Sequence, residues 1–152
     1  MMLFTNIIFV FSLIVIGIYD YKNYVIPNKL VIVVLNIGII HYVFNYFDFK
    51  FITGLITSFS IYLILYFLFP KGIGFGDVKL AGAIGLFLGF KLTILAILLS
   101  FFSGAIVGLL LIALHKKSMK DPIPFGPFLA LGAIASLFFG ESIINWYLGL
   151  YF

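Results

Sequence analysis

Long apolar runs alternate with short polar stretches along the whole chain. The apolar runs cover residues 3–19, 30–47, 51–69, 80–114 and a last segment from Phe125 toward Glu141. A membrane-spanning helix needs about 20 apolar residues. The run 80–114 is too long for one span, so we divide it near Gly89–Lys91 into a short fourth span and a fifth at about 92–114. The pattern predicts six spans, which must be helical because an open sheet leaves backbone groups unpaired in lipid and barrel-like alternation is missing.

The first apolar run is interpreted as a retained span rather than a signal peptide. No positively charged region precedes it, and no small-residue cleavage site follows it. We therefore expect residues 1–152 to form a single all-α polytopic membrane domain.

Composition excludes several classes of protein. Hydrophobic residues make up 64% of the chain and charged residues 9%, whereas soluble domains average about 45–50% and about 25%. A disordered chain and a water-soluble globule are both excluded. The chain has no cysteine, which excludes disulfides, thiol catalysis and cysteine-ligated zinc. His41 and His115 lie in different segments, so we expect no metal and no cofactor.

The distribution of lysine predicts how the chain is oriented. Nine lysines and no arginine give a net charge of +4, but they lie singly or in pairs between apolar runs, so we do not expect nucleic-acid binding. Seven lysines fall in the first, third and fifth polar stretches (20–29, 70–79 and 115–124), and only Lys50 and Lys91 fall in the second and fourth. Positively charged loops face the cytoplasm, so both termini are expected outside.

Small residues recur at four-residue spacing in two of the predicted spans. One ridge contains Ala81, Gly85 and Gly89, and the other contains Ser100, Gly104 and Gly108. Small residues at this spacing let helix backbones approach closely. We interpret both ridges as packing faces and nothing more.

Two of the five acidic residues stand out by their position. Asp48, Asp121 and Glu141 are expected in loops or at the membrane interface. Asp20 and Asp77 each lie at the predicted cytoplasmic end of a span, on the same membrane face. Ionisable groups near membrane depth are costly and are candidates for function. Taken alone, each could be an interfacial acid or a helix cap, and Asp77 suits the cap well.

Two carboxyl groups held together in a site of low dielectric can share one proton and activate water. The ionised group takes a proton from the water, and the protonated group donates to the substrate carbonyl. The water then attacks the peptide carbon with no metal and no covalent intermediate; aspartic proteases are the known example. Gly72, Gly74 and Gly76 precede Asp77. They allow another backbone to approach and permit conformations closed to other residues, although a flexible connector would also contain glycines.

Three segments of the chain resemble the type IV prepilin peptidases, which belong to the GxGD intramembrane aspartic proteases. GFGDVKLAGAIGLFLG (residues 74–89) matches the family's GxGD signature and its usual Lys-Leu continuation. DYKNYVIPNKL (20–30) resembles the segment with the first catalytic aspartate, and IPFGPFLALG (123–132) resembles the last-span signature. The motifs occur in the family's order and cover nearly the whole chain.

The resemblance implies a function and a set of site residues. Asp20 and Asp77 would be the catalytic pair of an endopeptidase that removes the short basic leader of prepilins or pseudopilins. The cut would fall at the cytoplasmic face of a prokaryotic inner membrane, in contact with membrane lipid. Longer members carry a cysteine-containing segment linked to N-methylation, so we expect peptidase activity only. Substrate contacts are expected at residues beside the motifs: Gly74, Gly76, Lys79, Pro124 and Gly126.

Several alternatives remain open at this stage. Lys79 could tune the aspartate pair or anchor the chain in anionic headgroups, and Pro124 could simply start the last helix. A small transporter or channel could use paired carboxylates as a proton or ion relay. Relay acids, however, tend to lie near mid-membrane, whereas Asp20 and Asp77 share one face. A structural subunit of a pilus or secretion machine would not need two acids on one side.

Overall fold

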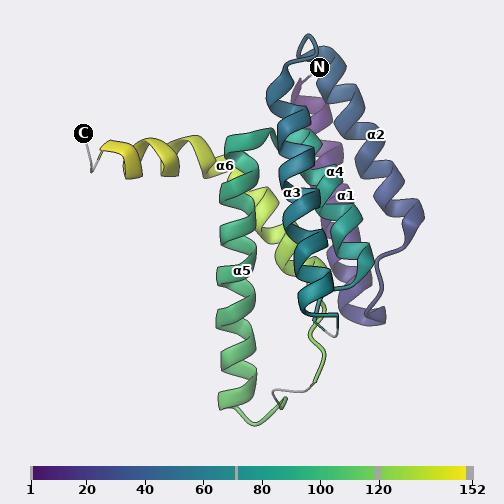
Figure 1. Ribbon diagram of the computed structural model, residues 1–152, viewed down its shortest axis with the longest axis vertical. Coiled ribbons are helices and arrows are strands. Elements are labelled where there is room, and N and C mark those ends of the chain that lie inside the picture. The colour runs from purple at the N-terminus through teal and green to yellow at the C-terminus, as the bar shows by residue number, and fades with distance from the viewer. Residues whose placement is uncertain (1, 71, 119–120, 150–152) are drawn as a thin grey trace.

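The computed structural model describes residues 2–70, 72–118 and 121–149 of the chain, and within them all regular structure is helical (Figure 1). The helices are α1 (Met2–Asn23), α2 (Asn28–Phe44), α3 (Phe49–Leu68), α4 (Phe75–Leu88), α5 (Phe90–Ala113) and α6 (Gly126–Gly149). Helices α1, α3, α5 and α6 are long and apolar enough to cross a membrane. The all-α polytopic class expected from the sequence is confirmed.

Two helix boundaries differ from those that the apolar pattern predicts. Helix α4 begins at Phe75, so Asp77 lies inside its first turn and not before it. Helix α6 continues past Glu141 to Gly149. Apolar runs mark the part of a helix that contacts lipid or core, and they miss a polar first turn that is stabilised by hydrogen bonds.

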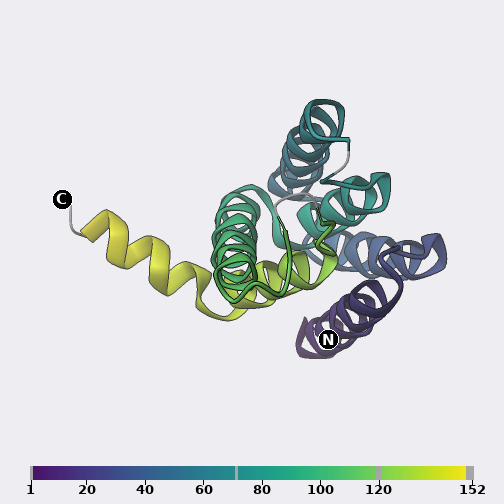
Figure 2. The ribbon, with the colours of Figure 1, turned by 90° about the horizontal axis from the view of Figure 1, so that it is seen from below.

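Helix α4 is the centre of the bundle. From Asp77 to Leu88 every residue except Lys79 is buried. Helices α2 and α3 pack on two sides of α4, and α5 and α6 also contact it; Figure 2 shows the arrangement from below. With 14 residues α4 is about 21 Å long, shorter than the roughly 30 Å of a hydrocarbon core. A helix enclosed by others does not itself have to match the bilayer.

Both ridges of small residues lie at helix crossings, as predicted. Gly85 of α4 meets Gly54 of α3 so closely that neither position has room for a side chain. The Ser58 hydroxyl on α3 donates to the Ala81 carbonyl at 2.8 Å. On α5, Ser100 is in close contact with Gly132 of α6. These contacts let backbones approach without large side chains between them.

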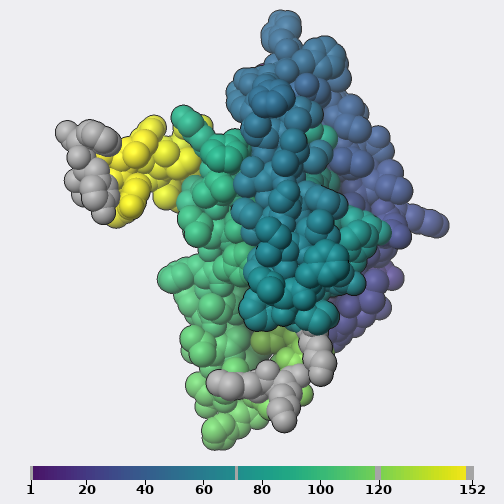
Figure 3. Space-filling view, in the orientation of Figure 1, coloured from purple at the N-terminus to yellow at the C-terminus, as the bar shows by residue number. Residues whose placement is uncertain are grey.

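The loops divide between the two ends of the bundle. The α1–α2, α3–α4 and α5–α6 connections gather at the lower end in Figure 1, and the N-terminus and the other two connections lie at the upper end. The C-terminal part of α6, which carries the exposed Trp146, projects away from the bundle. In Figure 3, α3 forms the front of the molecule and α2 borders it on the right.

Candidate functional site

Asp20 and Asp77 line the same cavity at the end where the three loops gather. Asp20 lies in the last two turns of α1, and Asp77 lies in the first turn of α4. Their exposed fractions are 4% and 7%. The cavity has a volume of about 370 Å³ and is bounded by the α1–α2, α3–α4 and α5–α6 loops. The fold thus brings together two acids that are far apart in the sequence.

The Asp20 carboxylate is held by the first residue of α6. Its Oδ2 atom accepts a hydrogen bond from the Gly126 backbone N–H at 2.8 Å. A Cβ atom at position 126 would lie 2.7 Å from the same oxygen. Any side chain there would push the carboxylate away, so the contact needs glycine. The carboxylate lies at the N-terminus of α6, where the helix dipole favours negative charge.

The Asp77 carboxylate is held in a similar way by its own helix. Its Oδ2 atom accepts from the Gly74 N–H at 2.8 Å, and the Asp77 N–H donates to the Gly74 carbonyl at 3.0 Å. Asp77 therefore caps α4 from the third helical position. Its second oxygen, Oδ1, is buried and has no hydrogen-bond partner in the described structure. Capping therefore uses Oδ2, and Oδ1 is left without a bond to the protein.

No described lysine neutralises either carboxylate. Within the described ranges the one ion pair joins Lys50 to Asp48. Asp20 and Asp77 do interact with each other electrostatically. Backbone N–H groups, and not cations, therefore hold the two acids.

The three motifs meet at this cavity. A Cβ atom at Gly76 would lie 3.1 Å from Ile26 Cβ, so Gly76 lets the α1–α2 loop pack against the first turn of α4. Gly126 connects the last motif to Asp20. The glycines before Asp77 permit conformations closed to other residues, but they do not use this freedom, since Gly89 is the one glycine with positive φ among the described residues. Gly76 supplies space, not an unusual backbone.

The structure separates the residues that were expected to contact substrate. Gly74, Gly76 and Pro124 line the cavity, and Gly126 contacts Asp20. Lys79 does not line it. Its Nζ atom donates to Asn28 Oδ1 at 3.0 Å and lies 4.9 Å from the centroid of the Phe75 ring.

Sequence reasoning missed two residues at the edge of the cavity. Tyr24 lines it and has a φ of 57°. Lys117 donates to the Tyr24 hydroxyl at 3.2 Å and to the Pro122 carbonyl. This lysine joins the end of α1 to the loop that leads into α6. Tyr24 follows Asp20 by about one helical turn, a signal that could have singled it out, whereas nothing distinguished Lys117 from its neighbouring lysines.

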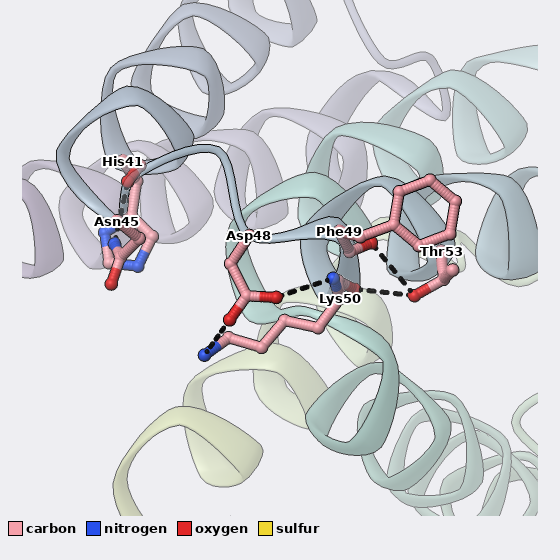
Figure 4. Close-up of polar contacts among 6 residues, drawn as sticks. All are labelled: His41, Asn45, Asp48, Phe49, Lys50 and Thr53. Carbon is pink, nitrogen blue, oxygen red and sulfur yellow. Dashed lines mark hydrogen bonds and ion pairs between the residues drawn. The ribbon is translucent and has the colours of Figure 1, made fainter.

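The remaining acids have ordinary structural roles, as predicted for Asp48 and Asp121. Asp48 precedes α3 and accepts from the Lys50 N–H at 2.9 Å, while Lys50 Nζ lies 3.0 Å from its other oxygen (Figure 4). The Lys50 N–H lowers the pKa of Asp48, and the Ser118 N–H lowers the pKa of Asp121 in the α5–α6 loop. Glu141 is exposed on α6. In the described ranges no three potential metal ligands cluster, and the absence of a metal requirement stays a prediction.

Comparison with known proteins identifies the family. The profile of the type IV leader peptidase family matches residues 7–109. The chain belongs to this family. A prepilin leader peptidase/N-methyltransferase of Legionella pneumophila is 34% identical over 137 residues, which cover 86% of this chain and 48% of the relative.

Two further relatives carry the same name. The Pseudomonas aeruginosa protein is 31% identical, with 90% of this chain and 50% of the relative covered. The Bacillus subtilis protein is 28% identical, with 96% and 60% covered. This type IV leader peptidase family member spans about half the length of the Legionella pneumophila and Pseudomonas aeruginosa relatives. No solved structure matches it significantly.

Proposed function

We propose that this family member is a membrane-embedded aspartic endopeptidase that removes the leader peptide of prepilins or related pilin-like precursors. One observation carries the proposal: Asp20 and Asp77 share one buried cavity, and each is held through a single oxygen by a glycine N–H. This arrangement places two carboxyl groups in one cavity without a neutralising lysine among the described residues. The names of the relatives point to the same reaction.

The proposed reaction uses both carboxyl groups and one water molecule. The pair carries a single proton, because two buried carboxylates without cations repel each other when both are ionised. The ionised group takes a proton from the water, which attacks the scissile carbonyl carbon. The protonated group donates its proton to the carbonyl oxygen, which gives a tetrahedral diol. The group that took the water proton then gives it to the leaving nitrogen as the C–N bond breaks, and the diol returns a hydroxyl proton to the other carboxylate. The leader leaves with a new carboxyl group, and the shortened precursor leaves with a new amine. Asp77 Oδ1, which has no partner, is available for the contact with water.

The substrate is proposed to enter from the loop end of the bundle. Gly74, Gly76, Pro124 and Gly126 then lie beside the scissile peptide, where small or rigid residues leave room for an extended chain. We place this end at the cytoplasmic face of a prokaryotic inner membrane, with both termini outside, because seven of the nine lysines belong to the loops at this end or to the helix turns beside them. Surrounding lipid is the proposed environment of the exposed apolar helix faces.

Cleavage of a purified precursor tests the proposal. The protein in detergent is mixed with a prepilin-type precursor, and the mass of the product is measured. We expect a shortened product from the wild type and none from Asp20→Asn or Asp77→Asn, with Asp48→Asn as the control. An intact precursor in the wild-type reaction would overturn the assignment. An unmethylated product N-terminus in the presence of a methyl donor is expected if the chain has peptidase activity only.

Labelling from one side of the membrane tests the orientation. The chain has no cysteine, so single replacements are the only thiols. We expect Lys22→Cys to react with an impermeant thiol reagent from the cytoplasmic side and Lys50→Cys from the outer side. The reverse pattern would invert the proposed topology.

A further inference from the structure

A groove on the outside of the bundle runs between α2 and α3. Both helices pack on α4 but hardly contact each other, so α4 forms the floor. The groove has a volume of about 420 Å³. Its floor consists of Gly82 and Ala83, and its walls include Ile32, Leu35 and Phe59. A Cβ atom at position 82 would lie 3.3 Å from the Phe59 ring, so glycine keeps the floor low.

Polar groups line only one end of this groove. They are Asn28 at the start of α2 and Lys79 in α4, and every other lining residue is apolar. The Lys79 ammonium has three donors, and one of them goes to Asn28. No carboxylate lines the groove, and Lys79 has no ion pair among the described residues. The groove therefore carries a single positive charge at one end of a long apolar surface.

This distribution of charge matches the chemistry of an anionic lipid. Lys79 lies in the second turn of α4, close to the end of the bundle where the loops gather, and the apolar part of the groove runs from there along the helices. A phosphate needs a cation at the polar boundary, and an acyl chain needs apolar walls in the membrane interior. A zwitterionic lipid also has a phosphate, but its own ammonium group neutralises that charge, so a lipid with net negative charge is the better counter-ion for Lys79.

We propose that the groove between α2 and α3 binds one anionic phospholipid of the leaflet on the loop side, with the phosphate on Lys79 and an acyl chain along Ile32, Leu35 and Phe59. The site is separate from the cavity with the two aspartates, because Lys79 does not line that cavity. The bound lipid would also secure the contact between Lys79 and Asn28, which joins α2 to α4. Binding does not depend on the proposed peptidase activity.

Native mass spectrometry of the purified protein tests this site. The protein in neutral detergent is titrated with phosphatidylglycerol and, separately, with phosphatidylcholine. For the wild type we expect one tightly bound phosphatidylglycerol molecule and weaker binding of phosphatidylcholine. Lys79→Met should lower the affinity for phosphatidylglycerol about fivefold, the effect of one lysine on binding to anionic lipid. Lys79→Arg should restore it, and Lys22→Met, which removes an exposed lysine away from the groove, should match the wild type.

A second variant tests the apolar part of the groove. Leu35→Trp places a large ring in the groove without changing its charge, and should lower the affinity for both lipids. Equal binding of the two lipids by the wild type, or wild-type affinity in Lys79→Met, would overturn the proposal. One-to-one displacement of the lipid by a prepilin-type peptide would overturn it too, because the groove would then be the seat of the substrate.

Discussion

Aspartates at the two ends of the bundle make the same local contact in different surroundings. At the upper end in Figure 1, Asp48 accepts a backbone N–H at the start of α3. At the lower end, Asp77 and Asp20 do the same at the starts of α4 and α6. Asp48 is exposed and paired with Lys50, whereas the other two are buried without a lysine partner among the described residues.

The difference shows that helix capping by itself says little about function. An exposed and paired carboxylate remains ionised and has nothing to exchange with a substrate. Two buried carboxylates in one cavity can hold and transfer a proton. Burial and the second acid, not the hydrogen bond to the helix, distinguish the candidate site.

The largest contrast is expected from removing the titrating groups. Asp20→Asn and Asp77→Asn keep the volume of the side chain and should each lower kcat by at least about 10²-fold, because general acid–base transfer contributes 10²–10⁴. Asp48→Asn should cleave like the wild type. Rates are measured on a purified precursor, with circular dichroism as the check of folding. Substantial activity in either buried variant would remove the distinction between the two ends.

A pair of glycine variants tests how precisely the carboxylates must be placed. In Gly126→Ala the new methyl group would lie 2.7 Å from Asp20 Oδ2, whereas in Gly74→Ala it would lie 3.4 Å from Asp77 Oδ2. The first distance forces Asp20 to move, and the second is an ordinary contact. A shift of about 1 Å can cost about 10²-fold in rate, so Gly126→Ala should be far slower than Gly74→Ala in a kcat measurement. Equal rates would show that the position of Asp20 is not critical.

The packing of the first motif against the second is tested at Gly76. Gly76→Val would press on Ile26, which lines the cavity, and should slow cleavage more than it reduces helix content. Gly72→Val is the matched control, because a Cβ atom at position 72 would come no closer than 3.7 Å to the atoms of other residues. The two variants are compared in cleavage assays and thermal unfolding. Wild-type cleavage by Gly76→Val would mean that this glycine is only a linker.

Each end also has a lysine over an aromatic ring. Lys117 Nζ lies 5.2 Å from the centroid of the Tyr24 ring, and Lys50 Nζ lies 4.9 Å from that of Phe51. Loss of the Lys117 contact should loosen the loop beside Asp20, so we expect Lys117→Met to lower kcat/KM. The expected factor is about threefold, because an exposed cation–π contact stabilises by about 0.5–1 kcal/mol. Lys117→Arg should recover most of the wild-type kcat/KM. Lys50→Met should leave cleavage unchanged, and a similar loss in both would point to a general effect on stability.

The smallest effect is expected from acid pH at Asp48. Its pKa is lowered by the Lys50 N–H and ammonium, so its stabilising contribution is present at neutral pH and disappears as the pH falls through this lowered pKa. The melting temperatures of the wild type and Asp48→Asn should therefore differ slightly at neutral pH and converge in strong acid. A difference that grows as the pH falls would contradict this sign.

Much of this protein was predictable from its sequence because the relevant signals are local. Apolar runs report which segments avoid water, so the helices α1, α2, α3 and α5 were predicted within a few residues. The helix ends that carry Asp20 and Asp77 were assigned to one end of the bundle, where the structure places them, because connections between successive spans alternate between faces. The small-residue ridges were recognised from their spacing.

Contacts between distant segments were decided only by the tertiary structure. The sequence contains Gly126, but only packing of α6 against α1 brings its N–H to Asp20. It contains Lys79, but only the position of α2 turns this lysine toward Asn28 and away from the aspartates. A hydrophobic pattern records how much burial each segment needs and not which neighbour supplies it. Which glycine holds which carboxylate therefore depends on how the helices pack.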